Sequence, residues 1–142
     1  MTPAYTRCGE NGRMPADLPF LDADALKALA AAQPDVPCTA CASLRSPGWE
    51  ALSATFDARQ LRKVATLRPP GVDEPPLEEH HPAGTNSWSA DAPIAVRFFP
   101  YNRCDVWQCV RCGKPFLRYT EYGGYYVEER CRPLALDLIV DS

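Results

Sequence analysis

The sequence predicts an α+β domain in which N-terminal helices pack on a small antiparallel sheet. Helical spacing of apolar residues is confined to the first half of the chain, whereas short runs with the period of β-strands follow residue 93. Two Cys-x-x-Cys pairs, one in each half, lie at 38–41 and 109–112. Because 142 residues with 46% apolar content can build one modest core, we expect a single domain over residues 1–142.

The first helix is expected in LDADALKALAAAQ, residues 21–33. Asp22 and Asp24 are candidate N-caps, and the helix must end before Pro34. One apolar face would be formed by three leucines, Leu21, Leu26 and Leu29.

A second helix is expected in FDARQLRKVATL, residues 56–67, where Asp57 and Gln60 have the spacing of a capping box. Between the two helices, SPGWEALSATF at 46–56 is expected to form a short helical turn with Trp49 as its apolar anchor.

Residues 69–93 are expected to form a long loop. They contain six prolines and five carboxylates but no lysine or arginine, a composition that disfavours a long ordered element. Loops of this length are often functional, so we expect either an excursion that wraps the surface or a partner-binding arm. Trp88 is the natural anchor for such a loop.

Four strands are expected after this loop, with Gly123 and Gly124 as a two-residue hairpin turn between the last two. The strands are PIAVRFF (93–99), CDVWQCV (104–110), FLRYTEY (116–122) and YYVEERC (125–131). In the third strand, alternation places Phe116 and Arg118 on one face and Leu117 and Tyr119 on the other. Neither face is cleanly apolar, so one face of the sheet is expected to be only partly covered.

Composition indicates a cytoplasmic chain and makes metal binding the first chemistry to consider. No stretch has the length and apolar character of a membrane span, and the N-terminus lacks the pattern of a signal peptide. In a reducing compartment, seven cysteines favour metal or redox chemistry over disulfides. The net charge of −3 argues against a protein devoted to nonspecific duplex binding.

The two Cys-x-x-Cys pairs have the form of zinc knuckles. In each pair a tight turn can aim both sulfurs at one ion, and Gly113 can adopt the positive φ needed to leave the second turn. Here the chain resembles the zinc-ribbon proteins, in which two such knuckles face each other across one ion. The resemblance implies one structural Zn²⁺ held by Cys38, Cys41, Cys109 and Cys112. The pairs are 67 residues apart, against about 15 to 20 in compact ribbons, but the entropy cost of a longer loop grows only logarithmically.

The cysteines also allow other interpretations. Cys104, Cys109 and Cys112 have the spacing of part of a plant-type ferredoxin loop, with Cys131 as a fourth ligand. A redox dithiol and a set of reduced thiols without metal are further alternatives. Cys8, Cys104 and Cys131 lie outside the favoured site, and we expect them to be inert thiols.

Two further features bear on function. Adjacent histidines, His80 and His81, are candidates for catalysis or a second metal, although neighbours in an extended loop point in opposite directions. The C-terminal half also interleaves aromatic and basic residues, which on an open sheet can stack bases and neutralise phosphates. We expect most of these aromatic residues to form the core instead.

The favoured hypothesis is therefore a zinc-stabilised protein-recognition or adaptor domain with a protein partner. A single-stranded nucleic-acid-binding zinc-ribbon protein is the first alternative, and a metal-dependent enzyme using His80 and His81 is the second. An enzyme lacks support from any recognisable catalytic motif.

Overall fold

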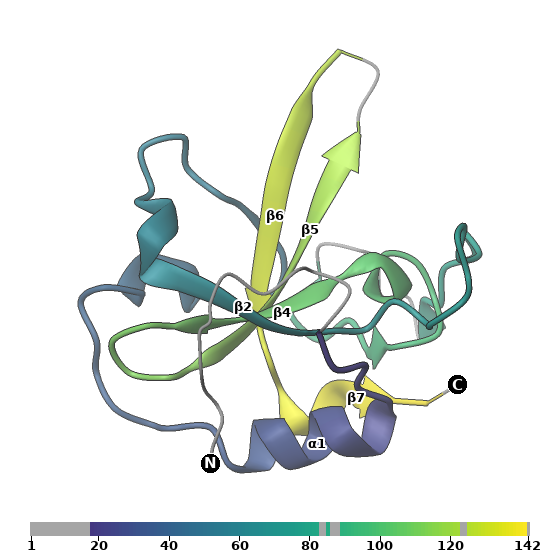
Figure 1. The fold of residues 1–142 in the computed structure, drawn as a ribbon, viewed down its shortest axis with the longest axis horizontal. Coiled ribbons are helices and arrows are strands. Elements are labelled where there is room, and N and C mark those ends of the chain that lie inside the picture. The colour runs from purple at the N-terminus through teal and green to yellow at the C-terminus, as the bar shows by residue number, and fades with distance from the viewer. Residues whose placement is uncertain (1–17, 83–84, 86–88, 123–124, 142) are drawn as a thin grey trace.

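The computed structural model describes residues 18–82, 85, 89–122 and 125–141. One α-helix accompanies a five-stranded antiparallel sheet with the strand order β1-β6-β5-β4-β2 and a two-stranded parallel sheet of β3 and β7 (Figure 1). This architecture confirms the α+β prediction. The helix and strands are α1 (Ala23–Ala31), β1 (Glu50–Ala51), β2 (Leu61–Thr66), β3 (Ile94–Ala95), β4 (Asp105–Cys109), β5 (Pro115–Tyr122), β6 (Val127–Pro133) and β7 (Ile139–Val140). Short 3-10 helices are η2 (Ala42–Leu44), η3 (Ala58–Gln60), η5 (Tyr101–Arg103) and η6 (Leu136–Leu138).

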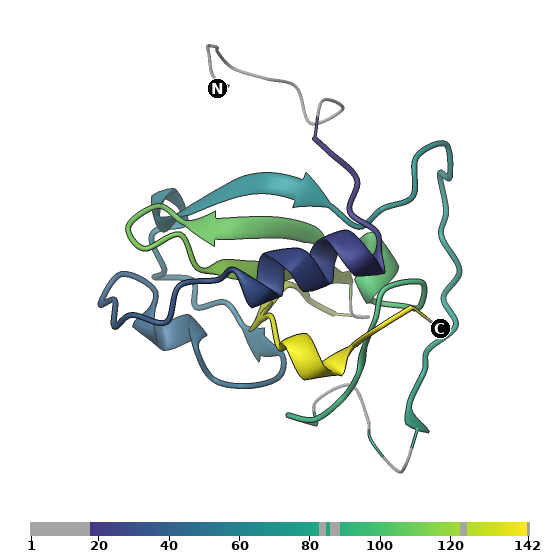
Figure 2. The same cartoon turned by 90° about the horizontal axis from the view of Figure 1, so that it is seen from below.

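Helix α1 forms where the sequence predicts it. Asp22 is the N-cap, and its carboxylate accepts a hydrogen bond from the backbone N–H of Ala25 at 2.9 Å. Leu26 is fully buried, and the leucines on either side of it pack against the same core. The helix lies over the sheet face that carries Val106 and Leu117, as Figure 2 shows from below.

The predicted helix over 56–67 is wrong. Asp57 does cap a helical turn, because its carboxylate accepts from Arg59 N, but that turn is only the 3-10 helix η3. From Leu61 the chain is strand β2, which pairs with β4 and has a bulge between Lys63 and Ala65. Pairing with a distant strand supplies backbone hydrogen bonds and burial that override the local helical pattern.

The prediction of a helical turn over 46–56 is also wrong. Trp49, which was expected to anchor this segment, is nevertheless buried. Glu50 and Ala51 instead form the edge strand β1 against β6. In the expected strand 93–99 only β3 is extended, and it pairs in parallel with β7, which the sequence did not predict.

The predicted hairpin is present as β5 and β6, which pair from Phe116 opposite Pro133 to Tyr122 opposite Val127. Its turn at Gly123 and Gly124 lies outside the described residues. Strand β4 covers β5 only as far as Arg118, so the far half of the hairpin extends beyond the rest of the sheet (Figure 1). The outer edge of β5 from Tyr119 to Tyr122 has no strand partner within the described residues.

Buried residues form two cores, one on each face of the sheet. The helix-side core contains the buried residues under α1, among them Trp49, Tyr101, Val106 and Leu117. The metal-side core is smaller and consists of Cys41, Leu44, Leu61, Cys109, Phe116 and Cys131. Phe116 and Leu117 are adjacent in β5 but belong to different cores, so both faces of the sheet are partly apolar.

The proline-rich segment 69–93 is a loop without α-helix or strand in its described part. Its middle is fastened to η5, since the carbonyls of Pro75 and Pro76 accept hydrogen bonds from Arg103 and Asn102 at 2.8 Å each. The loop therefore wraps this side of the surface. Its expected anchor, Trp88, lies outside the described residues.

Candidate metal centre

The first Cys-x-x-Cys pair lies in a turn between α1 and η2. Cys41 is the N-terminal neighbour of η2, and its carbonyl accepts a hydrogen bond from Leu44 N at 3.0 Å. Leu44 is buried in the metal-side core, so packing holds this turn against the sheet. Cys41 is fully buried, whereas Cys38 is half-buried.

The second pair forms the tight connection between β4 and β5. Cys109 ends β4, and the turn is closed by hydrogen bonds from Gly113 N to Cys109 O at 2.8 Å and from Cys109 N to Lys114 O at 3.0 Å. Gly113 has a φ of 83°, as expected of the residue that leaves such a turn. Val110 N also donates to Gln60 O at 2.9 Å, which joins this turn to η3.

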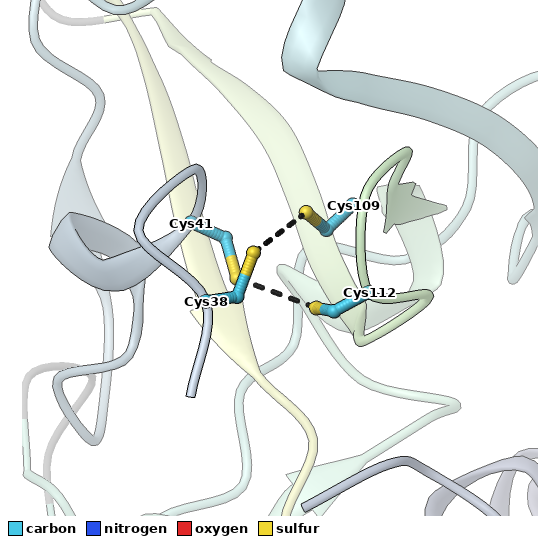
Figure 3. Close-up of side chains that lie close together, drawn as sticks. All are labelled: Cys38, Cys41, Cys109 and Cys112. Carbon is cyan, nitrogen blue, oxygen red and sulfur yellow. Dashed lines mark hydrogen bonds between the residues drawn. The ribbon is translucent and has the colours of Figure 1, made fainter. Parts of the chain in front are cut away.

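The two turns face each other and bring four sulfurs together (Figure 3). All four Sγ atoms lie within 4.8 Å of one another; Cys38 and Cys109 are separated by 3.8 Å and Cys41 and Cys112 by 3.7 Å. Four thiolates about 2.3 Å from a central ion in a regular tetrahedron lie about 3.8 Å apart. The four cysteines selected from the sequence can therefore hold one tetrahedral metal ion.

Arg45 supplies positive charge at this cluster. Its Nε donates to Cys41 Sγ at 3.4 Å and its Nη2 to Cys112 Sγ at 3.6 Å, so one guanidinium bridges the two turns. Sequence reasoning missed Arg45. Its only local signal is its position one helical turn after Cys41, and the contact with Cys112 depends on the tertiary fold.

The thiols of the cluster have different proton affinities. Burial raises the pKa of Cys38, but hydrogen bonds from the backbone of Cys41 and Ala40 outweigh it and lower this pKa to about 7. Burial raises the pKa of Cys41 to about 12, in spite of the hydrogen bond from Arg45. Metal binding must therefore displace protons, at least from Cys41.

The remaining described cysteines are not among the four sulfurs of the cluster, although Cys131 packs in the same metal-side core. Cys104 is fully buried in the helix-side core, where its Sγ donates to Pro100 O at 3.3 Å and burial raises its pKa well above the usual value. Burial likewise raises the pKa of Cys131 to about 12. Neither joins Cys109 and Cys112 in a group of potential ligands, so the ferredoxin-like set is not assembled. Cys8 lies outside the described residues.

The adjacent histidines have separate surroundings. The His80 ring packs on Phe98 with centroids 5.2 Å apart, and His81 Nε2 contacts the carboxylate of Glu79. Within the described residues, the four-cysteine cluster is the only group of three or more potential ligands that can share an ion, and it contains neither histidine.

The aromatic residues of the C-terminal half are divided between the interior and the surface, so the expectation that most of them form the core is met only in part. Tyr122, Tyr125 and Tyr126 are exposed. Tyr101 and Tyr119 are buried and pack on Trp49 with ring centroids 5.6 and 4.9 Å away. Trp107 is flanked by two cations, with Arg118 4.3 Å and Lys63 5.2 Å from its ring centroid. These cations are themselves paired with the carboxylates of Glu129 and Asp105, respectively.

A cleft of about 430 Å³ lies beside the unpaired edge of β5. Charged residues of both signs line the cleft together with five aromatic or apolar residues. The latter are Leu77, Phe99, Trp107, Tyr119 and Tyr122. Tyr122 is 76% exposed. The edge and the cleft together offer hydrogen-bonding groups next to apolar surface.

Comparison with known proteins adds no family to this description, since no protein-family model, curated protein or solved structure matches the chain. Within the described residues, no helix is long and apolar enough to cross a membrane. The most specific chemical feature of the chain is the cluster of four cysteine sulfurs where the two turns meet.

Proposed function

We propose that this chain is a zinc-stabilised domain whose task is to recognise a protein partner. The observation that carries the zinc assignment is the set of four cysteine sulfurs with near-tetrahedral spacing. Sulfur-only tetrahedral sites suit zinc, and a closed set of four protein ligands leaves no open position for catalysis. The ion is structural: it joins a turn after α1 to the β4–β5 connection.

Elemental analysis of the purified chain tests the metal. We expect one zinc per chain and essentially no iron. Tetrahedral thiolate sites can also take iron, so iron in place of zinc, or visible absorption from a sulfur cluster, would contradict the assignment.

Recognition of an extended protein segment is supported by the free edge of β5. A peptide can add to such an edge through main-chain hydrogen bonds while its side chains enter neighbouring hollows. Here the unpaired stretch from Tyr119 to Tyr122 borders the cleft that contains Trp107. We propose that the partner supplies a strand with apolar side chains at this edge.

The nucleic-acid alternative has weaker support. Stacking on a nucleic acid requires exposed rings beside free cations. Tyr122, Tyr125 and Tyr126 are exposed, but the cations beside Trp107 are paired with carboxylates. The enzyme alternative has weaker support still, since His80 and His81 do not converge on the metal cluster.

Two measurements separate protein recognition from nucleic-acid binding. Quantitative affinity enrichment compares the wild type with Tyr122→Lys, which alters the cleft, and with Val36→Lys, an exposed position outside it. We expect partners retained by the wild type and Val36→Lys to be lost from Tyr122→Lys. A partner set that Tyr122→Lys leaves unchanged would contradict recognition at this edge.

The second measurement is fluorescence polarisation with single-stranded DNA and RNA at two salt concentrations. We expect no salt-sensitive binding by the wild type. Micromolar affinity that falls with salt would favour the nucleic-acid alternative.

A further inference from the structure

A second hollow of about 300 Å³ lies next to the metal cluster and is lined by three cationic side chains. These are Arg45, Lys114 and Arg132; Arg45 also contacts the cysteine sulfurs. The rest of the wall is small or apolar, without an acidic residue: Pro47, Gly48, Ala90, Pro133, Leu134 and Ala135. Segments before β1, at the start of β5 and at the end of β6 meet here.

Arg132 is a buried cation without a counterion in the described part of the chain. It is 1% exposed and donates from Nη1 to Tyr101 Oη at 2.8 Å and to Ala92 O at 3.5 Å. Its Nε is buried and has no hydrogen-bond partner. The same strand contains Arg130, which is paired with two glutamates. The rings of Trp49 and Tyr101, with centroids 5.9 Å away, supply no negative charge. Because a buried charge is unfavourable unless it is paired, the surroundings of Arg132 favour the binding of an anion.

Lys114 and Arg45 keep donors available for the same anion. Lys114 Nζ donates to Gln33 Oε1 at 2.8 Å, and Arg45 uses Nε and Nη2 on the two sulfurs. An ammonium has three N–H groups and a guanidinium five, so both retain unused donors. The proposed zinc with four thiolates carries two net negative charges, fewer than the three positive charges that line the hollow.

We infer that this hollow is a binding site for a phosphate group, free or carried on a small molecule, held by Arg132, Lys114 and Arg45. Three converging cations favour a dianion over a monocarboxylate, and guanidinium groups match the geometry of phosphate oxygens. The volume lies at the lower end of the range of small-molecule sites, about 300 to 1,000 Å³, so the site suits a compact ligand.

Calorimetric titration of the metal-loaded chain with inorganic phosphate, at constant ionic strength, tests the site. We expect saturable binding with a one-to-one stoichiometry. Arg132→Gln should abolish it, and Lys114→Gln should weaken it at least about tenfold through loss of a charge-assisted hydrogen bond. Arg111→Gln is the matched control, because Arg111 is an exposed cation of the same turn that does not line the hollow.

Parallel measurements keep the outcome decisive if Arg132→Gln fails to fold. In that case Lys114→Gln is the only variant needed to test the site, and its zinc content is measured in the same sample. Loss of phosphate binding with zinc retained supports the site. The inference is overturned by absent binding at about 10 mM phosphate, by an equal loss in Arg111→Gln, or by a loss that accompanies zinc release. A parallel titration with malonate is expected to give weaker binding, and malonate binding as tight as phosphate would overturn the assignment to phosphate.

Discussion

The two cores of this protein lie on opposite faces of one sheet and are held together in different ways. Fifteen described residues are buried in the helix-side core, whereas six are buried in the metal-side core and three of these are cysteines. The larger core can be stabilised by apolar burial alone. The smaller one buries fewer apolar residues, and a metal ion held by its two turns would supply a further constraint. With its metal bound, the chain would combine two sources of stability.

The largest expected effect is on the metal side. Cys112→Ser removes one ligand of the proposed zinc, and we expect loss of bound metal together with a loss of more than about 4 kcal/mol in unfolding free energy. For a chain of this size that corresponds to about 8 to 16 °C in Tm. Elemental analysis and thermal melts with and without a strong chelator measure it. Cys8→Ser, outside both pairs, is the control; equal melting temperatures for the two variants would show that Cys112 is not a ligand.

The corresponding change on the helix side is Leu26→Ala. Leu26 is fully buried in the helix-side core, so its truncation should lower the unfolding free energy by about 2 to 5 kcal/mol. Unlike Cys112→Ser, it should leave one metal ion per folded chain. Leu136 is half-exposed, so Leu136→Ala is the matched control, with an expected loss of unfolding free energy below about 1 kcal/mol. If Leu26→Ala released the metal, the two cores would not be separable.

A smaller effect is expected at Arg45, which bridges the two turns without being a ligand. Arg45→Ala should still bind the metal but about 10 to 100 times more weakly, as is typical when a partner of the ligands is removed, so a chelator should take the metal from this variant faster. The release can be followed with a chromogenic zinc indicator. Arg59→Ala removes an exposed arginine that pairs with Asp57, outside the cluster, and should leave the rate unchanged. An unchanged rate of metal release from Arg45→Ala would mean that the contacts of Arg45 with the sulfurs do not contribute to metal affinity.

The smallest effect is expected at the cap of α1. Asp22→Ala removes the acceptor for Ala25 N and should cost about 1 kcal/mol, or about 2 to 4 °C in Tm, without changing metal content. Asp24→Ala is the control, since Asp24 lies in the first turn but is not the cap. A greater loss from Asp24→Ala than from Asp22→Ala would contradict the observed cap.

The errors in the predicted fold are concentrated in segments whose structure depends on distant partners. Residues 56–67 have a cap and an apolar spacing suited to a helix, yet Leu61 pairs with Cys109 and the segment becomes β2. Glu50 and Ala51 become a strand only because β6 lies beside them. Neither partner is visible in a local window of sequence, and the backbone hydrogen bonds of a sheet outweigh the weak propensities within the window.

Local signals were enough to predict α1, the β5–β6 pair, the loop over residues 69–93 and the two cysteine turns, because caps, alternation, proline content and Cys-x-x-Cys spacing are all visible in short windows of sequence. The tertiary structure was needed to show that the two turns meet across 67 intervening residues, that Arg45 bridges them, and that Cys104 and Cys131 are not part of the ligand group. It also shows that Arg132, unlike Arg130 in the same strand, is buried beside a hollow and has no counterion among the described residues. Side chains far apart in the sequence come within reach of one another only through the packing of the sheet, and no local pattern encodes that distance.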